Sequence, residues 1–330
     1  MTTQLLEALY MPGMALPNDD SYYKQLLRNQ DFDSIAPQVY HLLKERDKLG
    51  EIPGFFYQYL KKQYLQTLQL NLFVKHQTNL LLNQFEDNKI EVVPLKGVFF
   101  AETYFGNLGA RRTSDIDLLI KEQNLEEAVK MVKNLGFTTE EERIPGHFHC
   151  SYSKQLPGSE IPLVVELHWD LLKESTANFS IHDFWRAATQ HGHSDFIKEL
   201  SASHEFYMIT LHGWRHNLDS LKYFMDIIQL IHCLKEEIDF EQLVAIAETH
   251  KTRRRIVRTL TTVYQEFPFL DKIKPFPYKS GKHYLNLSVK KDGSRFYKKY
   301  ADYIDYQYFS YDTPSHILNE VIETIFPGKK

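Results

Sequence analysis

The stretch EVVPLKGVFFAETYFGNLGARRTSDIDLLI, residues 91–120, decides the fold. It runs from a short β-branched segment through Lys96 and Gly97 to a second apolar segment that carries Asp115 and Asp117. Because side chains alternate along a strand, the two aspartates are expected on one face, with the residue between them on the other. Two carboxylates this close repel each other unless a positive charge lies between them. The pattern therefore predicts a divalent cation, together with the phosphates that it carries.

The apolar pattern around this stretch predicts a small α/β core between helical regions. Apolar residues recur at three- and four-residue steps over 20–88 and again from about 180 onward, as in amphipathic helices. Strands are expected at 89–95, 114–120, 148–154 and 161–171, the last two joined by a turn at Pro157-Gly158, and helices at 98–105 and 124–135, the second ending at Gly136. The tail from residue 273 is rich in aromatic residues and Lys, with weak periodicity.

The expected fold class is therefore α/β (α+β), with a small mixed β-sheet. We expect a helical N-terminal region over 1–88, the sheet-containing core over 89–175 and a helical C-terminal region over 176–330. A chain of 330 residues is long enough for one large domain or two moderate ones.

Composition narrows the function classes. The formal net charge of −4 argues against a general nucleic-acid binder, although it leaves room for a local basic pocket. Two cysteines without CxxC spacing argue against a disulfide framework or a cysteine-based zinc site. The first residues lack the features of a signal peptide, and no apolar run reaches the ~18–20 residues of a membrane span. We expect a soluble, cytoplasmic protein with no membrane partner.

Further candidate site residues follow from their positions in strands and turns. Glu166 is the one charged residue in the apolar segment PLVVELHW, so it should be paired or bound to a metal, and it is the expected third carboxylate of a metal site. Lys96 and Gly97 stand where a strand gives way to a helix, where backbone N–H groups and a point charge favour phosphate. Three residues at or just before the start of the aspartate strand are further candidates for nucleotide contacts: Arg111, Arg112 and Ser114.

Each assignment has a plainer alternative. The aspartates could lie on an exposed strand edge, Glu166 could form a buried ion pair, and Lys96 could pair with a core acid. His168, beside Trp169, is expected to orient and cover Glu166. His212 and His216 have the spacing of a helical metal pair, but satisfied histidines at a helix interface are the favoured interpretation.

The ordered set of motifs resembles a known superfamily. Leu-Lys-Gly at 95–97, DIDLLI at 115–120, an amphipathic helix ending in Gly-Phe and ELHW at 166–169 are similar to the DNA-polymerase-β-like nucleotidyltransferases. The bacterial branch described only as uncharacterised nucleotidyltransferases is the closer match, and like it this chain has Val98 where a serine is usual. The resemblance implies that Asp115, Asp117 and Glu166 bind the metal and carry catalysis.

The same resemblance implies transfer of a nucleotidyl group, NMP, from a nucleoside triphosphate to a small molecule or a protein, with release of pyrophosphate. Mg²⁺ or Mn²⁺ is the implied cofactor, and ATP is the first nucleotide to expect. The helical region closes over the nucleotide in related transferases, so Lys222 and Asp226 are candidates for the site, with a surface ion pair as the alternative.

Two rival functions stay open. One is a catalytically degenerate module that binds a nucleotide or another ligand. The other is an antitoxin-like partner protein that acts through its helical surfaces. A long nucleic acid is disfavoured as a substrate, whereas a tRNA end stays possible. The sequence alone determines neither the acceptor, nor the base of the nucleoside triphosphate, nor the oligomeric state.

Overall fold

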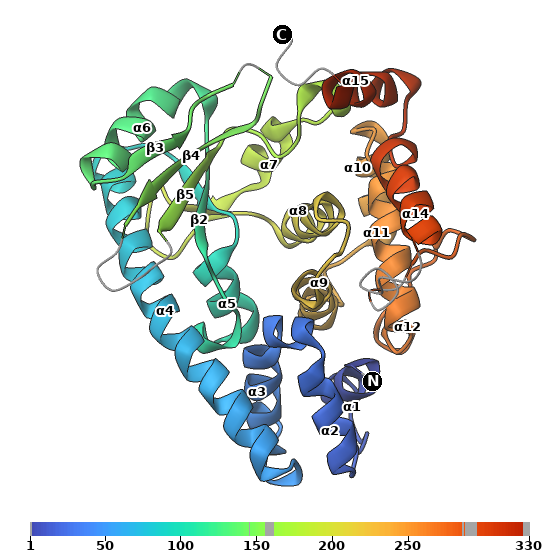
Figure 1. The fold of residues 1–330 in the computed structure, drawn as a ribbon. Coiled ribbons are helices and arrows are strands. Elements are labelled where there is room, and N and C mark those ends of the chain that lie inside the picture. Colours follow the sequence, from blue (N-terminus) through green and yellow to red (C-terminus); the bar gives the residue numbers. More distant parts are fainter. Residues whose placement is uncertain (1, 145, 156–161, 286, 288–295, 326–330) are drawn as a thin grey trace. The chain divides into compact units, whose positions relative to one another are not determined.

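The computed structural model describes residues 2–144, 146–155, 162–285, 287 and 296–325 (Figure 1). It divides into two compact units, of which the first comprises Met1–Tyr64, Ser175–Phe179 and Phe206–Lys330, and the second Leu65–Glu174 and Ser180–Glu205. The turn expected at Pro157-Gly158 lies outside the described residues.

A five-stranded mixed sheet forms the centre of the second unit. Its strands follow the order β1-β2-β5-β4-β3: β1 (Val92–Pro94), β2 (Asp115–Ile120), β5 (Leu163–His168), β4 (His149–Lys154) and β3 (Thr138–Glu141). The β2 and β5 strands are parallel, whereas the β1–β2, β4–β5 and β3–β4 pairs are antiparallel. The expected α/β class with a mixed sheet is confirmed. The sequence pattern did not predict β3, nor a two-stranded sheet of β6 (Thr189–Gln190) and β7 (Lys198–Glu199).

The helices of this unit follow the expected pattern. The long α4 (Gly54–Asp87) precedes β1, α5 (Gly97–Phe105) follows it, and α6 (Leu125–Asn134) and α7 (Ile181–Ala187) come later. After α6, Gly136 adopts a φ of 85°, the left-handed conformation that commonly ends a helix. The C-terminal part of α4 and α6 lie along one side of the sheet (Figure 1).

The two faces of the sheet have different chemistry because the side chains alternate. One face is apolar and packs on α4 and α6 in a continuous core that includes Val74, Leu81, Phe85, Ile116, Leu118, Val132, Val165 and Leu167. The residues between these core positions on β2 and β5 point to the opposite face, which carries the acids of both strands. The core therefore fixes which side of the sheet presents the carboxylates.

The first unit is helical. Its helices are α1 (Thr2–Tyr10), α2 (Asp20–Arg28), α3 (Ala36–Glu45), the start of α4, α8 (Ala202–Arg215) from Phe206 onward, α9 (Leu221–Cys233), α10 (Phe240–Thr249), α11 (Arg253–Glu266), α12 (Leu270–Ile273), α14 (Phe296–Phe309) and α15 (Pro314–Ile325). The buried Asp31 carboxylate accepts hydrogen bonds from Leu221 N at 2.6 Å and Ser220 Oγ at 2.9 Å, and so caps α9.

The described part of the C-terminal tail contains the helices α14 and α15 despite its weak periodicity. Arg258 of α11 forms ion pairs with Asp302 at 2.8 Å and Asp305 at 2.7 Å on α14. Its guanidinium also lies 4.5 Å from the ring centroid of Tyr284. These contacts hold α14 against α11, and long-range ion pairs of this kind leave no periodic signal in the sequence.

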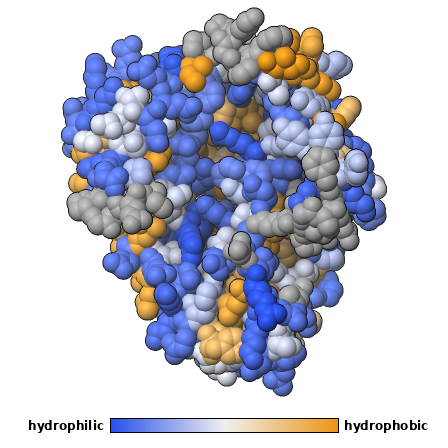
Figure 2. Space-filling model, viewed as in Figure 1, coloured by the Kyte–Doolittle hydropathy of each residue, from blue (hydrophilic) through white to orange (hydrophobic). Residues whose placement is uncertain are grey.

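Hydrophilic residues predominate on the face drawn in Figure 2, where apolar residues form small, separate patches. Among the described residues, no helix is both long enough and apolar enough to cross a membrane. Both cysteines are free thiols.

Leu118 tests the importance of the apolar face of the sheet. It is fully buried in the core, and we expect Leu118→Ala to lower the free energy of unfolding by about 2–5 kcal/mol, because a cavity replaces the leucine side chain. The matched control is Leu72→Ala on α4, where the leucine is 54% exposed and the change should stay within about 0.5 kcal/mol. Urea unfolding of both variants measures the difference, and equal losses would contradict the assignment of the core.

Candidate functional site

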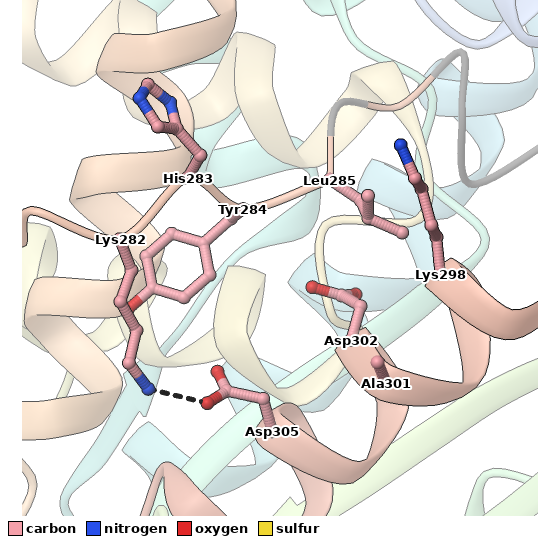
Figure 3. Close-up of a pocket in the computed structure, with 8 residues that line it drawn as sticks. All are labelled: Lys282, His283, Tyr284, Leu285, Lys298, Ala301, Asp302 and Asp305. Atoms are coloured by element: carbon pink, nitrogen blue, oxygen red, sulfur yellow. Dashed lines mark hydrogen bonds and ion pairs between the residues drawn. The ribbon is translucent and has the colours of Figure 1, made fainter.

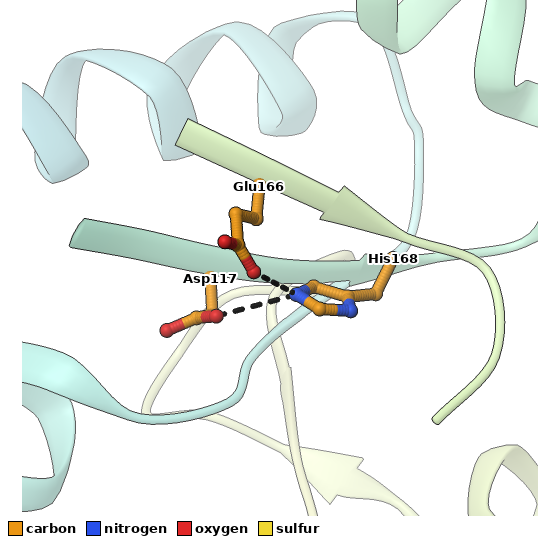
Figure 4. Close-up of side chains that lie close together, drawn as sticks. All are labelled: Asp117, Glu166 and His168. Atoms are coloured by element: carbon orange, nitrogen blue, oxygen red, sulfur yellow. Dashed lines mark hydrogen bonds and ion pairs between the residues drawn. The ribbon is translucent and has the colours of Figure 1, made fainter. Parts of the chain in front are cut away.

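The acids of the two parallel strands meet on the polar face of the sheet. The register of β2 and β5 places Asp117 directly opposite Glu166 (Figure 4). His168 lies beside both, with its Nε2 atom 3.2 Å from Oδ1 of Asp117 and 3.1 Å from Oε2 of Glu166. One imidazole N–H is therefore shared between two carboxylates. His168 contacts Asp117 as well as Glu166, the residue it was expected to orient.

Lys96 brings a second positive charge to the same carboxylate. Its Nζ atom lies 3.0 Å from Oδ1 of Asp117, whose side chain is fully buried, while the Lys96 side chain is 12% exposed. A backbone hydrogen bond of 3.1 Å from Leu95 N to Asp117 O holds the turn before α5 against β2. Lys96 therefore pairs with a buried acid, which is the alternative that the sequence left open beside a phosphate contact.

The charges in this cluster shift one another's ionisation. Burial alone raises the pKa of the Asp117 carboxyl, but Lys96 and His168 outweigh burial and hold that pKa well below its usual range. Burial likewise opposes the charged form of Glu166, yet the hydrogen bond from His168 leaves its pKa lowered. For Lys96 and His168 the neighbouring carboxylates outweigh burial and raise both pKa values. The cluster is thus a set of mutually compensating charges.

The donor set suits a divalent cation. Asp117, Glu166 and His168 each offer one ligand atom, and these atoms lie within 4.8 Å of one another. The ring would ligate through Nε2 only after giving up the proton that it shares between the carboxylates, so the oxygens of Asp117 and Glu166 are the ligands that a hard cation would take. Oδ2 of Asp117 is buried and has no hydrogen-bond partner among the described residues. That atom is a free acceptor for a cation, so the residues fit a metal ion.

Gly97 begins α5 in a conformation that suits a close backbone approach. Its φ is 68°, and a Cβ atom there would lie 3.2 Å from Cγ2 of Thr113 and 3.4 Å from the backbone oxygen of Asp115. A residue with a side chain would therefore be strained and crowded. Val98, the next residue, is buried in the core rather than turned to the polar face. The helix start thus offers backbone N–H groups without a serine hydroxyl.

The remaining candidates, at the start of β2 and just before it, occupy distinct environments. Asp115 is half-buried, accepts a hydrogen bond of 3.3 Å from Ser114 Oγ, and lies within electrostatic range of Lys96. Arg111 is buried, and its guanidinium lies 5.0 Å from the ring centroid of Phe100. Arg112 is half-buried. Phosphate contacts by Arg111, Arg112 and Ser114 stay predictions.

Four of the predicted residues belong to the first unit. Lys222 and Asp226 lie on α9, with Asp226 buried, and their role at a nucleotide site stays a prediction. His212 and His216 contact each other at a ring distance of 4.8 Å, and the His216 ring stacks on Tyr223 at 4.5 Å. This aromatic cluster accounts for the histidine spacing.

A cavity of about 410 Å³ in the first unit contains no predicted site residue. It is lined by Lys282, His283, Tyr284, Leu285, Lys298, Ala301, Asp302 and Asp305 (Figure 3). Asp305 pairs with Lys282 at 2.7 Å as well as with Arg258, which also holds Asp302. Both aspartates of the cavity are already paired with neighbouring cations, so they do not form a metal site like that of Asp117 and Glu166.

Two residues near the acids were not singled out from the sequence. The ring of His149 on β4 stacks on His168 at 5.1 Å, because the antiparallel register places the two opposite each other. Oγ1 of Thr113 is buried and has no hydrogen-bond partner among the described residues, and its methyl group faces Gly97. The strand register that brings His149 to the site cannot be read from local sequence, whereas Thr113 stands two residues before Asp115 and carries no signal of its own.

A mixed sheet with a strand-to-helix turn and a cluster of acids on one face is the arrangement that the motifs predicted for a nucleotidyltransferase. A family model described as uncharacterised nucleotidyltransferase matches residues 21–267. The chain therefore belongs to this nucleotidyltransferase family. Neither the curated proteins nor the solved structures include a significant match.

The turn at Gly97 yields a stability prediction. Gly97→Ala should lower the free energy of unfolding by about 2–3 kcal/mol, since it combines a left-handed residue, costing about 1–2 kcal/mol, with a close contact to Thr113. Gly106→Ala is the matched control, because Gly106 has a φ of 65° but open space around its Cβ position. Its loss should be about 1–2 kcal/mol. Urea unfolding that finds Gly106→Ala as damaging as Gly97→Ala would contradict the close approach at the turn.

Asp170 yields a pH prediction. Burial raises the pKa of this carboxyl from 3.8 to about 6, although Oδ1 accepts a hydrogen bond of 2.6 Å from Leu171 N. The folded protein holds this proton more tightly than the unfolded chain, so the contribution of Asp170 to stability falls as pH rises from about 4 to about 6. Asp170→Asn keeps the acceptor and should raise stability at pH 8 by about 1–2 kcal/mol.

Denaturant unfolding at pH 4 and pH 8, with EDTA present, measures this effect. The gain should be small at pH 4, where the wild-type carboxyl is protonated in the folded protein. A gain of equal size at both pH values would show that charge burial is not its cause.

Proposed function

We propose that this protein is a metal-dependent nucleotidyltransferase that moves NMP from a nucleoside triphosphate to a small-molecule or protein acceptor. The observation that carries the proposal is the convergence of Asp117 and Glu166 on one face of the sheet, with Oδ2 of Asp117 buried and available to a cation. Family membership supports the reaction class. Charged groups buried together in this way are characteristic of functional sites.

The residues divide into two roles in this proposal. Asp115, Asp117 and Glu166 hold Mg²⁺ or Mn²⁺, with His168 positioning two of the carboxylates. When bound, the ion neutralises the phosphates and lowers the pKa of the attacking hydroxyl. The start of α5 at Gly97 receives phosphate oxygens through backbone N–H groups, and Lys96 adds a point charge.

The proposed reaction is an in-line displacement at the α-phosphorus. An acceptor oxygen forms a bond to this phosphorus, and the bond to the bridging oxygen of the β-phosphate breaks, so that pyrophosphate leaves. Glu166 or one of the aspartates accepts the proton of the attacking group. ATP is the first nucleotide to test, with CTP, GTP and UTP beside it.

A degenerate, non-catalytic nucleotide-binding module is the second candidate. The observation in its favour is Val98, whose buried side chain leaves the start of α5 without a hydroxyl. This candidate predicts metal-dependent nucleotide binding without transfer. Incubation with NTPs labelled at the α-phosphate separates the two, because only the transferase passes label to an acceptor.

A thermal-shift titration with each NTP, with and without Mg²⁺ or Mn²⁺, tests the site. One NTP at ~100 times its dissociation constant should stabilise the wild type by about 2.7 kcal/mol, and only in the presence of metal. The stabilisation should vanish in the Asp115→Asn/Asp117→Asn variant and in Glu166→Gln. Asp87→Asn, at an exposed position of α4, is the matched control and should behave as the wild type.

The readout is the shift on adding ligand, not the melting temperature itself, because loss of the Asp117 charge alters stability on its own. A wild type that no NTP stabilises with either metal would remove the main support for the transferase. Equal stabilisation of the wild type and the double variant would place the nucleotide elsewhere.

A further inference from the structure

Lys96 is a fixed positive charge inside the cluster of acids. Its ammonium is 3.0 Å from Oδ1 of Asp117 and within electrostatic range of Asp115 and Glu166. The same three carboxylates are the proposed ligands of a divalent ion. The Lys96 ammonium therefore lies among the carboxylates that would bind the metal ion.

The ammonium and a metal ion compete for Asp117. Oδ1 of Asp117 already faces both Lys96 Nζ and His168 Nε2, which together use the two lone pairs of a carboxylate oxygen. An ion bound to Oδ1 at about 2.1 Å would have to displace one of these donors. An ion bound to Oδ2 of the same carboxylate would lie a few ångströms from the ammonium and be repelled by it.

The position of Lys96 in the chain offers the ammonium another partner. Lys96 is the N-cap residue of α5, so it stands directly before the first N–H groups of the helix. A triphosphate at the start of α5 would face both the N–H groups of the helix and this ammonium. A polyphosphate carries enough negative charge to draw the ammonium from Asp117 and leave that carboxylate to the metal.

We propose that Lys96 is a built-in counter-cation that makes binding of the divalent ion depend on the nucleotide's triphosphate. The inference rests on the proposed function and adds a binding order to it: metal alone binds weakly, and the triphosphate and the metal strengthen each other. By thermodynamic linkage, the metal must strengthen triphosphate binding by the same factor.

Lys96→Met tests the proposal, because methionine keeps much of the side-chain volume and removes the charge. Binding of Mn²⁺ alone is followed from the electron paramagnetic resonance signal of the free ion. Lys96→Met should bind Mn²⁺ at least ~10-fold more tightly than the wild type, and Lys96→Arg, which keeps the charge, should bind it about as weakly as the wild type. Binding of tripolyphosphate in EDTA should fall at least ~10-fold in Lys96→Met.

Lys121→Met is the matched control. Lys121 pairs with Glu91 just beyond the end of β2, so this variant loses a lysine–glutamate pair while the acid cluster is untouched. Its affinity for Mn²⁺ and tripolyphosphate should equal that of the wild type. If Lys96→Met fails to fold, Lys96→Gln takes its place with the same expectations.

The outcomes separate this proposal from the proposed function. If Lys96→Met binds Mn²⁺ no more tightly than the wild type does, the role of Lys96 as a counter-cation is overturned. The metal site itself is tested separately: it stands if the wild type binds Mn²⁺ and Asp117→Asn does not. A failure of both the wild type and Lys96→Met to bind Mn²⁺ overturns the metal site and the counter-cation together. Unchanged tripolyphosphate binding in Lys96→Met overturns the assignment of the ammonium to phosphate.

Discussion

The buried carboxylate of Asp117 is the constraint on which the site depends. Its residue is 3% exposed, and an unpaired charge at such depth costs several kcal/mol. Two strand pairings supply the compensation. The antiparallel pairing of β1 with β2 brings the turn after β1, and with it Lys96, to Asp117, while the parallel pairing with β5 brings His168. A slip of one residue between β2 and β5 would turn the acids of these strands toward the apolar core.

The sequence predicted the parts of the fold that repeat a pattern. The apolar runs in DIDLLI and around Glu166 identified β2 and β5, and the change of period at Lys96-Gly97 identified the turn into α5. It did not predict β3, whose residues Thr138–Glu141 are all exposed and polar, so that no face shows alternation. The two-residue strands β6 and β7 are too short to show any period.

The arrangement of the site was harder to predict than its members. The sequence marks Glu166 as a charged residue in an apolar strand, but it does not say which strand lies beside β2 or in which direction. That parallel register decides that His168 reaches Asp117 as well as Glu166. Local sequence did not indicate that the Arg111 guanidinium is buried 5.0 Å from the ring centroid of Phe100, and its contact with phosphate stays a prediction. Tertiary packing, not local sequence, decides such cases.

A crystal structure with Mn²⁺ and a non-hydrolysable nucleoside triphosphate analogue is the most direct test of a metal centre at these acids. The account predicts an anomalous peak about 2.1–2.3 Å from an oxygen of Asp117, with Asp115 and Glu166 in the same coordination sphere and the Lys96 ammonium turned to the phosphates. Anomalous peaks only at other positions, with Lys96 still paired to Asp117 in the presence of the analogue, would contradict it.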